Sequence, residues 1–182
     1  MRALGDIIDI GTCFAPVDID TANAWTGKRI SLAGAAAITF VFFGAVGGAE
    51  DLVLDWNQHT AYTGGTTADL DAVGVSTSRG LTEYYIKAET ALDNDESWVR
   101  VTQSVASELT VVGATYGAMQ KIVVSSIEAT QVADGYSHVS VNGAITTGTA
   151  QLAGGLYILH GLRQRRRPDR LGNLLNPNVA NA

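Results

Sequence analysis

Three histidines and one cysteine are the residues of this chain best suited to nucleophilic or metal chemistry. His59, His138 and His160 are the only histidines, and none has a partner at a metal-ligand spacing such as i, i+4. Cys13 lies in the stretch Gly-Thr-Cys-Phe-Ala-Pro, which matches no protease signature. A nucleophilic site would also need a histidine and an orienting acid. We therefore predict a surface position for His138, a small buried thiol for Cys13 and no metal site.

Acidic residues offer a second kind of chemistry. Asp51 with Asp55 or Glu83 could form the carboxylate pair of a glycoside hydrolase. Asp51 and Asp55 alternate with apolar residues, however, as on the solvated face of a strand. The acidic run at 93–96 lacks the glycine and distal glutamate of an EF-hand loop, which favours a polar turn. No phosphate-binding loop or dinucleotide fingerprint occurs, so we expect no enzymatic activity, no cofactor and no small-molecule substrate.

Charge is divided unevenly along the chain. Five of the 12 basic residues and only one of the 18 acids, Asp169, lie from residue 163 onwards, so a body of charge −10 (7 against 17) precedes an arm of charge +4. Guanidinium runs pair with carboxylates or phosphates. The acidic body, and the lack of aromatic residues between the arginines, argue against nucleic acid. We predict either an arm that docks on a neighbouring subunit or a solvated tail, with these partner-binding residues: Arg163, Arg165, Arg166, Arg167 and Arg170.

Short alternating runs separated by glycine-rich turns predict the fold class. Leu52, Leu54 and Trp56 fall on one face of one such run, and Tyr84 and Ile86 on one face of another. Roughly eight runs without a long amphipathic helix predict an all-β protein, an antiparallel, jelly-roll-like β-sandwich with extended N- and C-terminal arms. We divide the chain into an N-terminal arm or edge strand at 1–20, a sandwich body at 21–162 and a basic C-terminal arm at 163–182. A long surface loop is expected at 59–80, with a short strand at 72–76, and a single helical turn at 128–134.

The apolar stretch at 30–49 decides between two classes of protein. It contains no charged residue and has the length of a membrane span. Its glycines, however, confine the strongly apolar centre to residues 38–43, which are β-branched or aromatic. This composition is typical of a doubly buried strand. We predict a central strand, and no membrane partner.

Four segments resemble tailed-phage and prophage virion proteins of about this length: residues 11–22, 36–43, 98–103 and 151–161. The resemblance implies a non-enzymatic structural protein of the phage head, of the decoration, cement or minor head type, located in the virion. It implies the major capsid protein and copies of itself as partners, and it supplies no catalytic residues. On this interpretation residues 1–20 bind by edge pairing, and the arginines of the C-terminal arm pair with capsid carboxylates.

Three alternatives stay open at this point. A tail tube or terminator subunit is the nearest, because it too would assemble in many copies. A membrane-anchored protein is another. A carbohydrate-binding sandwich used for receptor recognition would require exposed aromatic residues on one face, for which the candidates are Trp25, Trp56, Trp98, Tyr62, Tyr84 and Tyr85.

Overall fold

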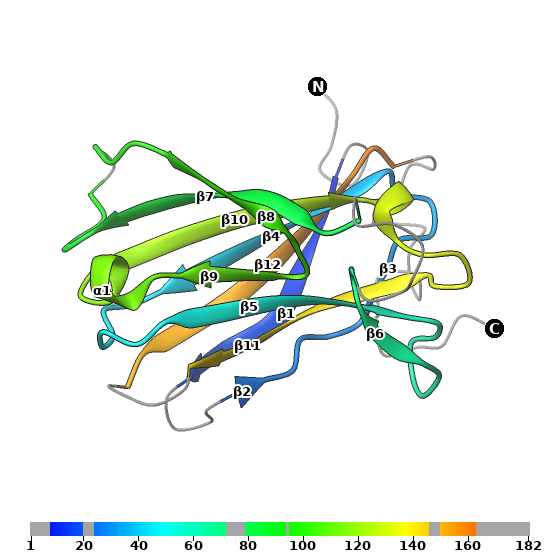
Figure 1. The fold of residues 1–182 in the computed structure, drawn as a ribbon, viewed down its shortest axis with the longest axis horizontal. Helices are drawn as coiled ribbons and strands as arrows, with labels where there is room; N and C mark the ends of the chain where they lie inside the picture. The colour runs from blue at the N-terminus through cyan, green and yellow to red at the C-terminus, as the bar shows by residue number, and fades with distance from the viewer. Residues whose placement is uncertain (1–7, 20–23, 72–78, 94, 146–149, 163–182) are drawn as a thin grey trace, which may run out of the picture.

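The computed structural model describes residues 8–19, 24–71, 79–93, 95–145 and 150–162, and these ranges form a two-layered β structure (Figure 1). Eight strands contain eight or more residues each: β1 (Ile8–Asp18), β4 (Ala37–Gly44), β5 (Leu52–His59), β7 (Leu81–Glu89), β8 (Val99–Ala106), β10 (Gln120–Glu128), β11 (His138–Ile145) and β12 (Leu152–His160). Four shorter strands lie between them: β2 (Ala24–Trp25), β3 (Ile30–Ser31), β6 (Thr67–Asp69) and β9 (Glu108–Val111).

The strands form two antiparallel sheets. The first sheet has the order β1-β12-β4-β10-β7-β8, and the second has the order β2-β11-β5-β6, with β3 added to β11 and β9 to β5. The first strand pairs with the last and the second with the last but one, which is the nested pairing expected when a hairpin wraps into a jelly roll. The predicted all-β antiparallel sandwich is confirmed.

The core lies between the two sheets. Leu54, Trp56 and Ile86 are almost fully buried, as their alternation predicts. The Trp56 indole crosses from the second sheet to the first, where its Nε1–H donates to Ser125 Oγ at 3.0 Å. Its ring also meets Phe40 edge-on at 6.3 Å between centroids. The polar tip of Trp56 therefore finds a partner inside the core, whereas the buried Nε1 of Trp25 has none among the described residues.

The apolar stretch at 30–49 folds as β3 and β4 with loops around them, and β4 lies third in the first sheet. The predicted central strand is confirmed. Among the described residues, no helix is long and apolar enough to cross a membrane. The expectation that β4 is buried on both faces is wrong for a single chain, because Phe40 and Phe42 are buried while Phe43 is 44% exposed.

The two ends of the chain differ in how much is described. Residues 8–18 form β1, an edge strand that pairs with β12 along its length except at two irregularities near Phe14. Residues 1–7 and the whole C-terminal arm at 163–182 lie outside the described residues, as does the strand predicted at 72–76. The remainder of the predicted 59–80 loop contains β6 and the buried Leu70.

Two short helical turns connect strands. One is α1 (Gly113–Tyr116), whose first N–H donates to Asp51 Oδ1 at 2.8 Å. The other is the 3-10 turn Ala129–Gln131, closed by a reciprocal capping box between Glu128 and Gln131. Gly135 follows it with φ +85°. This is the single turn predicted from the sequence at 128–134.

Candidate functional site

A polar network covers the outer face of the second sheet and contains two of the three histidines. His59 Nδ1 lies 2.9 Å from Thr67 Oγ1, and its Nε2 lies 2.9 Å from Ser140 Oγ. Asn142 continues the chain of contacts, donating from Nδ2 to Asn57 Oδ1 at 2.6 Å. Cross-strand register places His138 directly opposite His59. No pattern in the sequence predicts that these residues of β5 and β11 lie together.

Burial decides what this network can do. His59 is only 4% exposed and Ser140 only 1%. Burial, followed by the nearby positive charge of Arg29, lowers the pKa of His59 to about 4. Burial also lowers the pKa of His138, which is half-buried beside Tyr62 and not the plain surface histidine that was predicted. A neutral His59 could accept a proton from Ser140, but both side chains are buried in this structure, and their contacts join β5, β6 and β11.

Arg29 fixes the loop that closes this network. Its Nη1 donates to the carbonyl oxygens of Ala61 at 2.9 Å and Gly64 at 2.6 Å, and its Nη2 donates to Thr67 Oγ1 at 3.2 Å. The guanidinium therefore ties the β5–β6 turn to the segment between β2 and β3. Thr67 belongs to both sets of contacts, which links the loop to His59.

Cys13 is the buried thiol that was predicted. It is 1% exposed, and burial raises its pKa to about 12, against the opposing influence of Lys28. The thiolate is the reactive form of cysteine. A thiol held protonated at neutral pH and out of contact with solvent is a core residue.

The three carboxylates proposed for glycoside hydrolysis are held apart by different partners. Asp51 accepts the α1 N–H, and Asp55 accepts from Asn57 Nδ2 at 2.6 Å. Glu83 lies on the first sheet, where it forms an ion pair with Arg100. Burial raises the pKa of Asp55. The prediction that the face of β5 opposite Trp56 is solvated is wrong for Asn57, which is 7% exposed because the network above covers it.

The acidic run at 93–96 joins a larger cluster at the end of β7. Carboxylate oxygens of four residues lie within 4.8 Å of one another: Glu89, Asp93, Asp95 and Glu96. The negative charge of Asp95, with smaller contributions from burial, Asp93 and Glu96, raises the pKa of Glu89. This acidic cluster is exposed except for Glu96, which is partly covered.

Three of the six aromatic candidates for a sugar-binding face are buried. Trp25, Trp56 and Tyr84 belong to the core. Trp98 and Tyr85 remain exposed, at 49% and 39%, near the β7–β8 edge of the first sheet. Lys87 Nζ lies 5.3 Å from the centre of the Trp98 ring, a cation–π distance.

Part of the outer face of the first sheet is apolar where a solvated face would be polar. Six outward positions on strands β12, β4 and β10 define the outer apolar face: Val41 and Phe43 of β4, Ile122 and Val124 of β10, and Leu156 and Ile158 of β12. Outward Thr39, Ser126 and His160 border it as a hydrogen-bonded polar group. Val41 lies directly between Val124 and Leu156 in the register. An antiparallel sheet with one face in water normally alternates apolar with polar residues. The runs at 38–43, 122–124 and 156–159 lack this alternation, and that was the available signal in the sequence.

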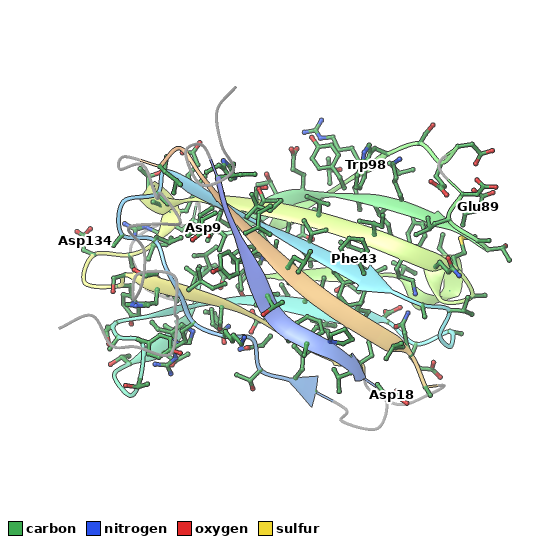
Figure 2. All side chains as sticks on the ribbon, turned by 180° about the vertical axis from the view of Figure 1, so that it is seen from behind. Asp9, Asp18, Phe43, Glu89, Trp98 and Asp134 are labelled. Atoms are coloured by element: carbon green, nitrogen blue, oxygen red, sulfur yellow. The ribbon has the colours of Figure 1, made fainter. Side chains whose placement is uncertain are left out.

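An open groove of about 510 Å³ lies at one end of this face. Its apolar walls come from Phe14, Pro16, Phe43, Leu92, Leu152 and Leu156. Figure 2 looks onto this side of the molecule, with Phe43 near the middle and Glu89 of the acidic cluster at the right-hand end. The sequence did not predict the groove, because β1, β4, β12 and the β7–β8 turn are brought together only by the fold.

A buried lysine borders the groove. Lys121 is 3% exposed, and burial lowers its pKa to about 8. It also lines a cavity of about 10 Å³ together with Glu50, Tyr116 and Gln151. That volume is about the size of one water molecule.

The five arginines predicted to bind a partner all lie outside the described residues, so their placement stays a prediction. Comparison with protein-family models, curated proteins and solved structures finds no match to this chain.

Proposed function

We propose that this chain is a non-enzymatic virion structural protein that binds and stabilises a phage head, with the major capsid protein and copies of itself as partners. The observation that carries the proposal is the outer apolar face of the first sheet. Its residues alternate with core residues along the same strands; Phe43 is exposed, and the other five are partly exposed. The segments that resemble virion proteins include β4 and β12, the strands that form much of this face.

The size of the face suits a protein partner. The three strands that carry the outer apolar face are eight or nine residues long and about 4.8 Å apart, which gives an area of roughly 400 Å². A standard protein–protein interface buries about 800 Å² per partner, of which this face would supply about half. Exposed apolar patches of this extent are typical of interaction surfaces and would favour aggregation if they remained in water.

Three other observations support an assembly protein over an enzyme. Cys13 and the His59–Ser140 pair are closed to substrate, and the proposed carboxylate pair is divided between separate partners. β1 leaves one edge of the first sheet available for pairing with another chain. We therefore assign the affinity of this protein to surfaces and arms.

The proposal is tested by locating the chain in virus particles. Particles from a host that produces the virus are purified on a density gradient, and the chain is detected by mass spectrometry and by antibody labelling in the electron microscope. We expect stoichiometric amounts of the chain, with the label on heads. Label on tails would favour the tube or terminator alternative, and absence from purified particles would refute a virion role.

Carbohydrate binding is the second candidate function, because Trp98 and Tyr85 are exposed near each other beside Lys87. Exposed aromatic faces stack on sugar rings, and a glycan array tests this directly. Binding that is lost in Trp98→Ala would favour receptor recognition. An array without hits would count against carbohydrate binding at this site.

A further inference from the structure

We propose that the groove at the end of the outer apolar face receives the C-terminal arm, residues 163–182, of a second copy of this chain. The apolar half of the arm would fill the groove while its arginines contact the acidic cluster. This contact joins copies in solution without any capsid, so it does not rest on the proposed virion function.

The groove is shaped for an extended apolar segment. Leu152, at 60% exposed, and Phe43 stand at its walls. Part of its lining is the backbone of Gly154 and Gly155 on β12, where a chain can approach closely because no outward side chain intervenes. A Cβ placed on Gly154 would still lie 3.5 Å from Pro16, in ordinary contact, so the surface there is open and not a clash.

The acidic cluster is attached to this groove by its own turn. Leu92 lines the groove, and its N–H donates to Gln120 Oε1 at 3.1 Å, which anchors the turn to β10. Asp93 follows directly. The four carboxylates repel one another, and the pKa of Glu89 is raised as a result. A row of bound guanidinium groups would relieve that repulsion, because arginine pairs with carboxylates through paired hydrogen bonds.

The arm has the matching chemistry in matching order. Five arginines and one acid occupy residues 163–170. Apolar side chains follow in the next nine residues: Leu171, Leu174, Leu175, Pro177 and Val179. Fully extended, the 20 residues of the arm could reach roughly 65–70 Å. The basic part of the arm is therefore next to its apolar part, as the acidic cluster is next to the groove.

Reach and charge together favour a second copy over the same chain. The described body ends at Leu162, just past the His160 end of β12, whereas the groove lies at the Leu152 end. The two ends are about 27 Å apart along the strand. To reach its own groove, a chain would stretch all of residues 163–170 across the outer apolar face, leaving the guanidinium groups on Val41 and Ile158. Binding in trans removes that constraint.

A mixing experiment tests the proposal with the full chain. Leu152→Asp places a charge at the groove wall, on a side chain that is 60% exposed, and leaves the core untouched. The double variant Leu174→Asp with Leu175→Asp disables the arm in the same way. By light scattering we expect wild-type chains to exceed the single-chain mass of 19.1 kDa as concentration rises. Each variant alone should remain at the single-chain mass, and an equimolar mixture should form a species of twice that mass.

The mixture should assemble because the groove variant retains an intact arm and the arm variant retains an intact groove. Circular dichroism of each variant checks that the fold is retained. At a concentration of about 1 mM, even a dimer with a Kd of about 1 mM would be half formed. The proposal is overturned if the wild-type protein stays at 19.1 kDa up to this concentration. Failure of the mixture to assemble while the wild type does so would also overturn it, since the arm would then bind its own chain or another surface.

A charge reversal tests the arginine contact separately. Arg166→Glu with Arg167→Glu should weaken wild-type assembly at least tenfold. Asp93→Arg with Asp95→Arg on the partner should restore most of the loss. If the Arg166→Glu, Arg167→Glu arm binds the native chain and the Asp93→Arg, Asp95→Arg chain equally well, the acidic cluster does not bind the arm.

Discussion

The buried side chain of His59 has a hydrogen-bond partner for each of its ring nitrogens. Both of its ring nitrogens lie 2.9 Å from hydroxyl oxygens, those of Thr67 and Ser140. Hydroxyl groups can donate or accept, so either neutral tautomer is satisfied. A protonated ring would be harder to accommodate, because burial and Arg29 both oppose the charge. The folded state therefore prefers the neutral form.

This preference makes stability depend on pH with a definite sign. The pKa of His59 is about 4 in the folded chain against an ordinary value of 6.5, so between these values the unfolded chain binds a proton that the folded chain does not. The contribution of neutral His59 to the free energy of unfolding is complete above pH 6.5 and is lost as the pH falls towards 4. We expect urea unfolding monitored by tryptophan fluorescence to show a loss on the order of 1–3 kcal/mol across this window. His59→Gln should flatten that slope, and an unchanged slope would contradict the assignment.

At this scale the sequence predicted which residues point inwards but not which outward residues are covered. Val139 and Val141 alternate with polar residues in the sequence, and both are at most 1% exposed. Ser140 is equally buried on the opposite face. Its cover comes from loops and strands distant in the chain, such as the Arg29 segment, and no local pattern encodes that.

At the scale of elements, β4 determines the fold. It lies in the middle of the first sheet, and its inward side chains form an aromatic cluster with residues of both sheets. The Phe42 ring lies 6.5 Å from Phe14 and 6.1 Å from Trp25, measured between centroids. Gly155 on the adjacent strand leaves room for this cluster, because a Cβ there would lie 2.5 Å from Phe14.

Two neighbouring substitutions on β4 should therefore behave oppositely. Phe42→Asp removes a fully buried ring, at about 3–5 kcal/mol, and adds a buried charge, which together should exceed the stability of an ordinary domain. We expect it to abolish folding, as judged by near-ultraviolet circular dichroism. Phe43→Asp should retain a cooperative unfolding transition, because Phe43 is already 44% exposed. A folded Phe42→Asp protein would refute the central role of this strand.

Long strands were predictable and short ones were not. Strands of eight or more residues can contain enough alternations to establish a period, as in β5, β7 and β11. β2, β3 and β6 have two or three residues each, and they exist because β11 or β5 offers an edge to pair with. Pairing of this kind depends on the folded sheet and leaves no periodic trace in the sequence.

At the scale of the whole molecule, the two sheets differ on their outer sides. Loops and hydrogen-bonded polar side chains cover much of the second sheet, whereas the first sheet presents apolar side chains, a groove and an adjoining acidic cluster. The lack of alternation in β4 was visible in the sequence and was interpreted as burial within the chain. The structure places the second apolar face outside the core, where a partner would complete its burial.

The occupancy of virus particles by Ile122→Glu tests the outer apolar face most directly. Ile122 lies outside the groove and opposite Lys87, which can pair with the new carboxylate and preserve the sheet. Ser104→Glu, at an exposed position of edge strand β8, is the matched control. Burying a charge in an interface costs desolvation free energy even when the charge is paired, and 1.4 kcal/mol already corresponds to a tenfold change in affinity. We predict at least tenfold fewer Ile122→Glu copies per particle than for wild type or Ser104→Glu. Equal occupancy of all three would contradict the account.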